Sequence, residues 1–164
     1  MPMRTGNTIL SIVAISMLVW NISGPAYAQD HLNDIDGVRS SMTEIGYKLP
    51  EMIKSAKPQD IRTLERVFEI NNYALMTIES YLKMLKVFSL GGGYLNKPTV
   101  DILNGWLKFI SNYCEYDIKY LDEARADTQD KTALDIIEKE RASIEALRNA
   151  AIKGSLENSK ILSE

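Results

Sequence analysis

The chain has 164 residues but only one cysteine and one histidine, and these scarcities exclude several classes of protein. A disulfide within the chain needs a second cysteine, so no disulfide framework holds the fold. Covalent haem attachment through Cys-x-x-Cys-His, the Glu-x-x-His pairs of di-iron bundles and the His-Glu-x-x-His pattern of zinc hydrolases all need more cysteine or histidine. The single histidine, His31, falls at the start of the first expected helix. We expect no metal site and no cofactor.

Long apolar runs are also missing, except at the amino terminus. There, Arg4 precedes an apolar run of 12 residues from Ile9 to Trp20, and residues 25–28 read Pro-Ala-Tyr-Ala. Signal peptidase accepts small residues at the first and third positions before the cut, which predicts cleavage after Ala28. The run is shorter than the roughly 20 residues that span a bilayer, which favours a cleaved signal over a retained anchor. Residues 1–28 are therefore predicted to be a signal peptide, and the mature protein to be periplasmic or secreted without stable membrane insertion.

The mature chain has no excess of basic residues. Without Arg4 it has 18 Lys and Arg against 22 Asp and Glu, a net charge of −4. Nucleic acids and anionic membrane surfaces are bound mainly through clustered Lys and Arg side chains. We expect neither as a partner.

No pattern of catalytic residues is evident either. Carboxylates at helical spacing form two pairs, Glu65 with Glu69 and Glu138 with Glu145. Both pairs lie among basic residues on faces that read as solvated, and no nucleophile is placed beside them. We expect that the protein is not an enzyme.

What the sequence does contain is apolar residues at alternating three- and four-residue steps. This spacing is typical of helices that bury one face, whereas the period-two alternation of strands is absent. The clearest stripe predicts a helix of roughly eight turns. Its members are Ile61, Leu64, Phe68, Asn71, Leu75, Ile78, Leu82 and Leu85.

Three further stripes predict three more helices, over residues 35–52, 100–124 and 134–151. Pro50 falls inside the first of them, and because the stripe continues beyond it, a kink is favoured over an end; a separate short helix over 50–56 is the alternative. Gly154 is expected to end the fourth helix. Residues 155–164 then form a polar tail.

Four helices joined by short turns favour one architecture. Short connections force neighbouring helices to be antiparallel, and similar lengths let every apolar face be covered. The sequence therefore predicts an all-α, four-helix up-down-up-down bundle over residues 29–154, after a cleaved signal peptide.

Polar residues interrupt three of the stripes at comparable heights. Asn71, Asp117 and Arg141 lie roughly 15, 10 and 10 Å from the bundle end that their helices share, at about 1.5 Å per residue. A charge buried alone is strongly unfavourable, so we expect Asp117 to pair with Arg141, with Asn71 close enough to hydrogen-bond one of them. This layer either fixes register and helix order or anchors a polar group of a ligand. A further alternative is that the fourth helix is rotated by one residue, which would place Arg141 in solvent instead of in this layer.

The third helix also carries aromatic residues and the single cysteine. Cys114 lies on the apolar stripe and is expected to be buried. Trp106 flanks that stripe, whereas Tyr116 points elsewhere, so part of this aromatic set is exposed or covered by a partner. Trp106 and Tyr116 are the candidate interface residues.

These features favour a protein that works by binding. Our leading interpretation is a non-enzymatic secreted or periplasmic bundle that binds another protein or another copy of itself. The alternative is a small-molecule-binding bundle of the sensor or carrier type, with Asn71, Asp117 and Arg141 as its polar floor.

Overall fold

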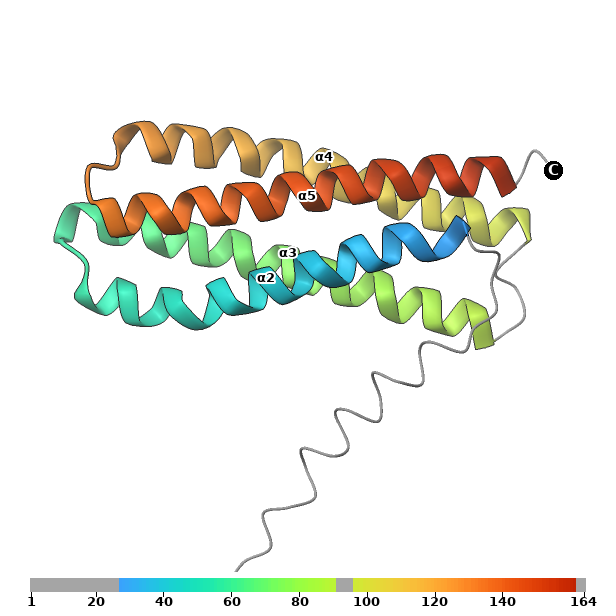
Figure 1. Cartoon of the computed structure of the whole chain (residues 1–164). Coiled ribbons are helices and arrows are strands. Elements are labelled where there is room, and N and C mark those ends of the chain that lie inside the picture. The colour runs from blue at the N-terminus through green and yellow to red at the C-terminus, as the bar shows by residue number, and fades with distance from the viewer. Residues whose placement is uncertain (1–26, 91–95, 162–164) are drawn as a thin grey trace, which may run out of the picture.

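The computed structural model describes residues 27–90 and 96–161, which form four helices and contain no strand. They are α2 (Tyr27–Ser55), α3 (Pro58–Leu90), α4 (Lys97–Asp127) and α5 (Lys131–Ile161) (Figure 1). The expected all-α bundle of four helices is confirmed. Residues 1–26, which make up most of the expected signal peptide, lie outside the described residues.

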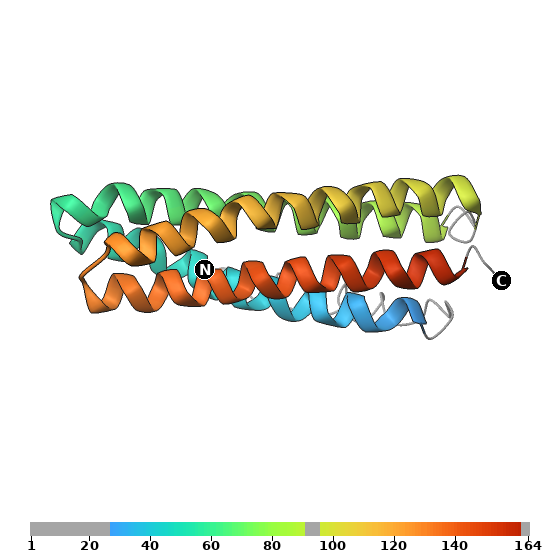
Figure 2. The ribbon, with the colours of Figure 1, turned by 90° about the horizontal axis from the view of Figure 1, so that it is seen from above.

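The helices lie side by side as the corners of a square, in the order α2, α3, α4, α5 (Figures 1 and 2). The most extensive backbone packing joins α4 to α5, followed by α2 to α5 and α2 to α3. The edge between α3 and α4 is packed less closely. The α2–α3 and α4–α5 connections lie at one end of the bundle, and the start of α2 and the end of α5 lie at the other (Figure 1).

None of the helices in the two described ranges has an apolar stretch long enough to cross a membrane.

The apolar stripe predicted over residues 100–124 lies on α4 and faces the core. Cys114 and Asp117 are buried on it, and Trp106 and Tyr120 are partly buried beside it. Each member follows the last by three or four residues, so all of them face the interior. The buried stripe is Val100, Leu103, Leu107, Ile110, Cys114, Asp117, Leu121 and Ala124.

The stripe of α3 is rotated slightly from the one predicted. Asn71 and Ile78 are fully buried as expected, but Phe68, Leu75 and Leu82 are only partly buried at the side of the core. The smaller Val67 and Ala74, and Tyr81, take the central positions instead. Two adjacent stripes of α3 are apolar, and spacing alone does not say which one faces the centre.

The helix ends differ from expectation at one point. Helix α2 continues through Pro50 to Ser55, so the helix does not end at the proline. Helix α5 runs through Gly154 to Ile161, and the expectation of a helix end at Gly154 and a polar tail after it is therefore wrong for residues 155–161. Gly154 is needed for a different reason: a Cβ there would lie 2.7 Å from His31 Cδ2, so the absence of a side chain lets α2 and α5 approach.

Candidate functional site

A fully buried asparagine of α3 lies at the centre of the polar layer. The Asn71 side-chain amide donates one hydrogen bond to the Met42 carbonyl oxygen of α2 and another to Glu140 Oε2 of α5, both at 2.9 Å. An amide nitrogen has two hydrogens, and both are used. Asn71 therefore joins three helices through one side chain.

Glu140, rather than Arg141, is the α5 member of this layer. Glu140 is fully buried. The Arg141 side chain is 30% exposed and donates to Asp122 Oδ1 at 2.6 Å and to Glu145 Oε2 at 2.8 Å. The predicted pairing of Arg141 with Asp117 is wrong, because the helix is rotated by one residue from the orientation that the pairing needs.

A longer reading of the α5 stripe identifies the correct residue. Ile137 and Ile144 are compatible with a polar member at either 140 or 141, since both positions give steps of three and four. The register through 141 continues to Arg148, whereas the register through Glu140 continues to Leu147. An apolar continuation favours Glu140, and Leu147 is indeed buried.

Asp117 comes to the layer from α4 and is 4% exposed. Its Oδ2 atom is buried and accepts no hydrogen bond from the described residues. Burial raises the pKa of this carboxyl to about 6, and the Arg66 guanidinium pulls the pKa in the opposite direction. Arg66 itself is exposed and hydrogen-bonds Glu69 at 2.8 Å, so it acts on Asp117 only through its charge.

The pKa of the second carboxyl of the layer, that of Glu140, is also raised. Burial raises the pKa of Glu140 to about 7; the hydrogen bond from Asn71 lowers it, and the negative charge of Asp117 raises it. Asp117 of the adjacent helix α4 therefore acts on Glu140 through its charge. At a pH near 6 the layer therefore holds a proton that exposed carboxyls have already lost.

A glycine of α2 makes room for this arrangement. A Cβ at Gly46 would lie 2.7 Å from Asn71 Oδ1, closer than carbon and oxygen can approach without displacement. The amide oxygen thus lies against the backbone of α2. Any larger residue at position 46 has to move Asn71 away from its two acceptors.

A second polar layer lies at the other end of the bundle, and the sequence reading missed it. His31 is fully buried; its Nδ1 lies 2.7 Å from Glu157 Oε2 and its Nε2 lies 3.1 Å from the Tyr81 hydroxyl. Burial lowers the pKa of His31, while the hydrogen bond and charge of Glu157 raise it. The signal was present: His31 lies four residues before Ile35 and so continues the α2 stripe.

Neither layer resembles a metal site. Within residues 27–90 and 96–161, no three His, Cys, Asp or Glu side chains are placed to hold a metal ion together. In both layers, titratable side chains are held away from water by the surrounding helices.

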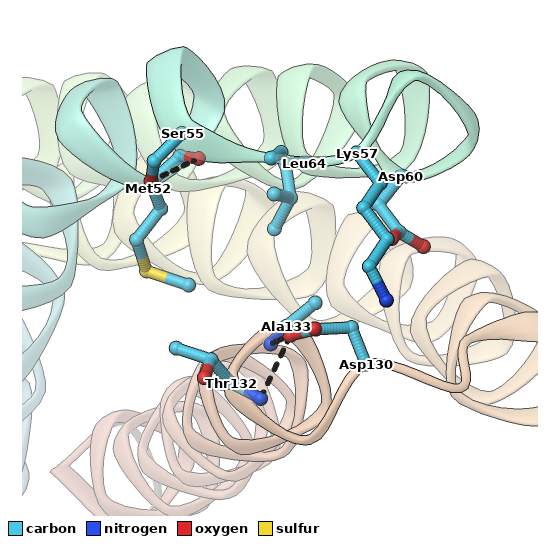
Figure 3. Close-up of a pocket in the computed structure, with 9 residues that line it drawn as sticks. Met52, Ser55, Lys57, Asp60, Leu64, Asp130, Thr132 and Ala133 are labelled. Carbon is cyan, nitrogen blue, oxygen red and sulfur yellow. Dashed lines mark hydrogen bonds between the residues drawn. The ribbon is translucent and has the colours of Figure 1, made fainter.

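The bundle end that carries the two short connections has a cleft of about 200 Å³ (Figure 3). Met52 and Leu64 form an apolar wall, and the Lys57 amine extends toward the gap. Asp130 closes the opposite side, and its Oδ1 accepts from the backbone N–H groups of Thr132 and Ala133. A shallower depression lies along α5 between Asn149 and Lys160. Neither space is lined by a residue of the central layer.

Trp106, one of the two candidate interface residues, belongs to a set of aromatic side chains on α4 that reaches Tyr73 of α3. Trp106 is partly buried and packs edge-on against Phe109, with ring centroids 5.8 Å apart. Phe109 stacks on Tyr113, which contacts Tyr73 of α3 with centroids 6.2 Å apart. Tyr116 is 77% exposed.

No protein-family model matches the chain, and no curated protein or solved structure is significantly similar to it. The geometry of the polar layers and of the aromatic surface is therefore the basis for a functional proposal.

Proposed function

We propose that this protein is a non-enzymatic helical-bundle protein that acts by binding another protein, or a second copy of itself, through the surface between α3 and α4. We further propose that a cleaved signal peptide delivers it to the periplasm or outside the cell. The position of the connections in Figure 1 supports the up-down-up-down order of its helices.

The observation that carries the binding proposal is the distribution of exposed apolar side chains. Nine large hydrophobic side chains of the described residues are exposed, and six of them lie on α3 and α4. Scattered single residues are ordinary on a protein surface, whereas exposed apolar side chains that contact one another are typical of a binding site, and Phe109 and Tyr73 are joined through Tyr113. The six are Tyr73, Met76, Val87, Ile102, Phe109 and Tyr116.

The spacing on α4 supports a helical or similarly ridged partner. Ile102, Trp106, Phe109, Tyr113, Tyr116 and Tyr120 follow one another by three or four residues, so α4 carries a second stripe beside its buried one. Such a stripe is the pattern that a packing helix recognises. The ring contacts among Trp106, Phe109 and Tyr113 hold these side chains in place, which limits the entropy lost on binding.

A single substitution tests this surface. Tyr116→Glu places a charge on the exposed stripe, and Tyr47→Glu makes the same change on α2, where Tyr47 is 81% exposed. We expect sedimentation of the purified full chain, and recovery of a stoichiometric partner from the native envelope or medium, to show an interaction that Tyr116→Glu weakens at least about tenfold. Tyr47→Glu should leave it unchanged. A monomer without a partner, or equal effects of both substitutions, would contradict the proposal.

The alternative is a small-molecule-binding bundle of the sensor or carrier type. One observation favours it: Asn71 Oδ1, Asp117 Oδ2 and Glu140 Oε1 are buried acceptors without donors, and a ligand with several donors would satisfy them. Such a ligand would need the helices to separate, since neither described cleft reaches these atoms.

A further inference from the structure

The central polar layer has more acceptors than donors. The two Asn71 amide hydrogens are donated to the Met42 carbonyl oxygen and to Glu140 Oε2. Three buried oxygens remain without a donor from any described residue: Asn71 Oδ1, Glu140 Oε1 and Asp117 Oδ2. An acceptor taken out of water without a donor destabilises the fold by about 1–3 kcal/mol, and more if it is charged.

The helices around the layer provide little to correct this deficit. Helix α2 contributes the Met42 carbonyl and Gly46, α3 contributes Asn71, and α4 contributes Asp117. Two basic groups act at a distance: Arg66 of α3 lowers the pKa of Asp117, and Arg148 of α5 lowers that of Cys114. Neither one hydrogen-bonds Asp117 or Glu140 in the described part of the chain.

A proton is the one ligand that needs no cavity. On a carboxyl oxygen it removes a buried negative charge and converts an acceptor into a donor. At Glu140 Oε1 it would do both, since Asn71 Oδ1 and Asp117 Oδ2 are the acceptors of the same layer that lack donors.

We propose that the Glu140/Asp117 pair is a proton-binding site in the bundle core, and that release of its proton to solvent weakens the packing around the layer. The bundle is then tightly held in acid and loosened above neutral pH. The energy for this response comes from holding two carboxylates away from water with no hydrogen bond from a basic side chain of the described residues; Arg148 Nε is buried as well but donates to neither of them.

The direction of the pH dependence follows from the carboxyl shifts. The folded-state pKa of Glu140, about 7, lies above its ordinary value of 4.5, and that of Asp117, about 6, lies above 3.8. The folded state therefore keeps protons that the unfolded chain has released. The stabilisation is fully present below the unfolded values and is lost as pH rises through the folded ones. Most of the change in the Glu140 contribution falls between about pH 4.5 and pH 7.

Denaturant unfolding of the full chain tests the site. Glu140→Gln is neutral at every pH and keeps a donor and an acceptor. We expect the unfolding constant of wild type, divided by that of Glu140→Gln, to rise at least about tenfold between pH 4.5 and pH 8. Any effect of His31 is common to both proteins and cancels. Glu138→Gln is the matched control, because Glu138 is exposed on the same helix and should leave the wild-type profile unchanged.

Two results would overturn the site. One is a Glu140→Gln effect of the same factor at both pH values, which would indicate a structural role without proton binding. The other, which does not require the variant to fold, comes from infrared spectroscopy of wild type at about pH 6, where exposed carboxyls are ionised. We expect the carbonyl band of a buried carboxylic acid that disappears by about pH 8; a spectrum without that band contradicts the proposal.

Discussion

The side-chain amide of Asn71 lies 2.9 Å from Glu140 Oε2, so an uncharged residue of α3 is the direct donor to a buried carboxyl of α5. A guanidinium or ammonium in that place would fix the carboxyl in its charged form. The amide supports Glu140 without neutralising it. The protonation state of Glu140 can therefore change with pH. The position of its carboxyl is held by Asn71, whose side chain does not titrate.

Removing the amide should be costly. Asn71→Leu keeps the number of side-chain heavy atoms but leaves Glu140 Oε2 without its donor and removes the second hydrogen bond to the Met42 carbonyl, which keeps its bond within α2. We expect a loss of about 2–4 kcal/mol of unfolding free energy by denaturant titration. Asn72→Leu is the control: Asn72 is the next residue of α3 and is exposed, so its change should stay within about 0.5 kcal/mol. Equal losses in the two variants would mean that the hydrogen bonds contribute nothing specific.

Two glycines of α2 should respond in opposite directions to alanine. Nothing lies within 4 Å of a Cβ at Gly37, so Gly37→Ala should stabilise the helix by about 0.5–1 kcal/mol through its backbone propensity. At Gly46 the same Cβ meets Asn71 Oδ1 at 2.7 Å, and we expect a net loss of about 1–3 kcal/mol. Thermal or denaturant unfolding measures both. Stabilisation by Gly46→Ala would show that Asn71 has room to move.

Arg141 should contribute little to stability. Its partners are the surface carboxylates Asp122 and Glu145, and exposed ion pairs contribute about 0–1 kcal/mol. Arg141→Gln should therefore reduce the unfolding free energy by less than about 1 kcal/mol. Breaking a buried pair with Asp117 would instead remove about 3–5 kcal/mol. A loss of unfolding free energy in that higher range would indicate that Arg141 is buried and paired with Asp117.

The thiol of Cys114 should be unreactive in the folded protein. It is buried as expected, and burial raises its pKa to about 12, with Asp117 adding to the shift. Because the thiolate is the reactive form, labelling by a thiol reagent at about pH 8 should require unfolding. The labelling rate should then rise with denaturant in proportion to the unfolded fraction. Stoichiometric labelling of the native protein within minutes would place the thiol at the surface.

How far the sequence predicts this structure depends on how unambiguous each stripe is. On α4 the buried stripe from Val100 to Ala124 has the predicted members, although Thr99 is also buried and Ile118 is partly buried beside the stripe. On α3, Phe68 and Val67 both fit the spacing, and the packing of α3 against its neighbours decides between them. The bundle and its helices follow from periodicity, whereas the exact rotation of a helix with two apolar sides does not.

The site was predicted in part for the same reason. Asn71 and Asp117 are predicted to face the interior because each is the single polar member of an apolar stripe, and both are buried. Glu140 was missed because its neighbour Arg141 also fits, and pairing it with Asp117 satisfied charge neutrality. The molecule instead places two carboxyls together. Considering stability alone predicts that a buried carboxylate is paired with a cation. That prediction does not apply to a layer in which, as we propose, a carboxyl is kept protonated.

The most direct test of the account is an NMR titration of the Glu140 carboxyl carbon in the full chain, assigned by comparison with Glu140→Gln. We predict a midpoint near 7, well above the ordinary 4.5, together with a second transition near 6 from Asp117. A Glu140 midpoint at or below about 4.5 would show that this carboxyl is ionised throughout the neutral range. Glu140 would then hold no proton near neutral pH, and the proposed site would be wrong.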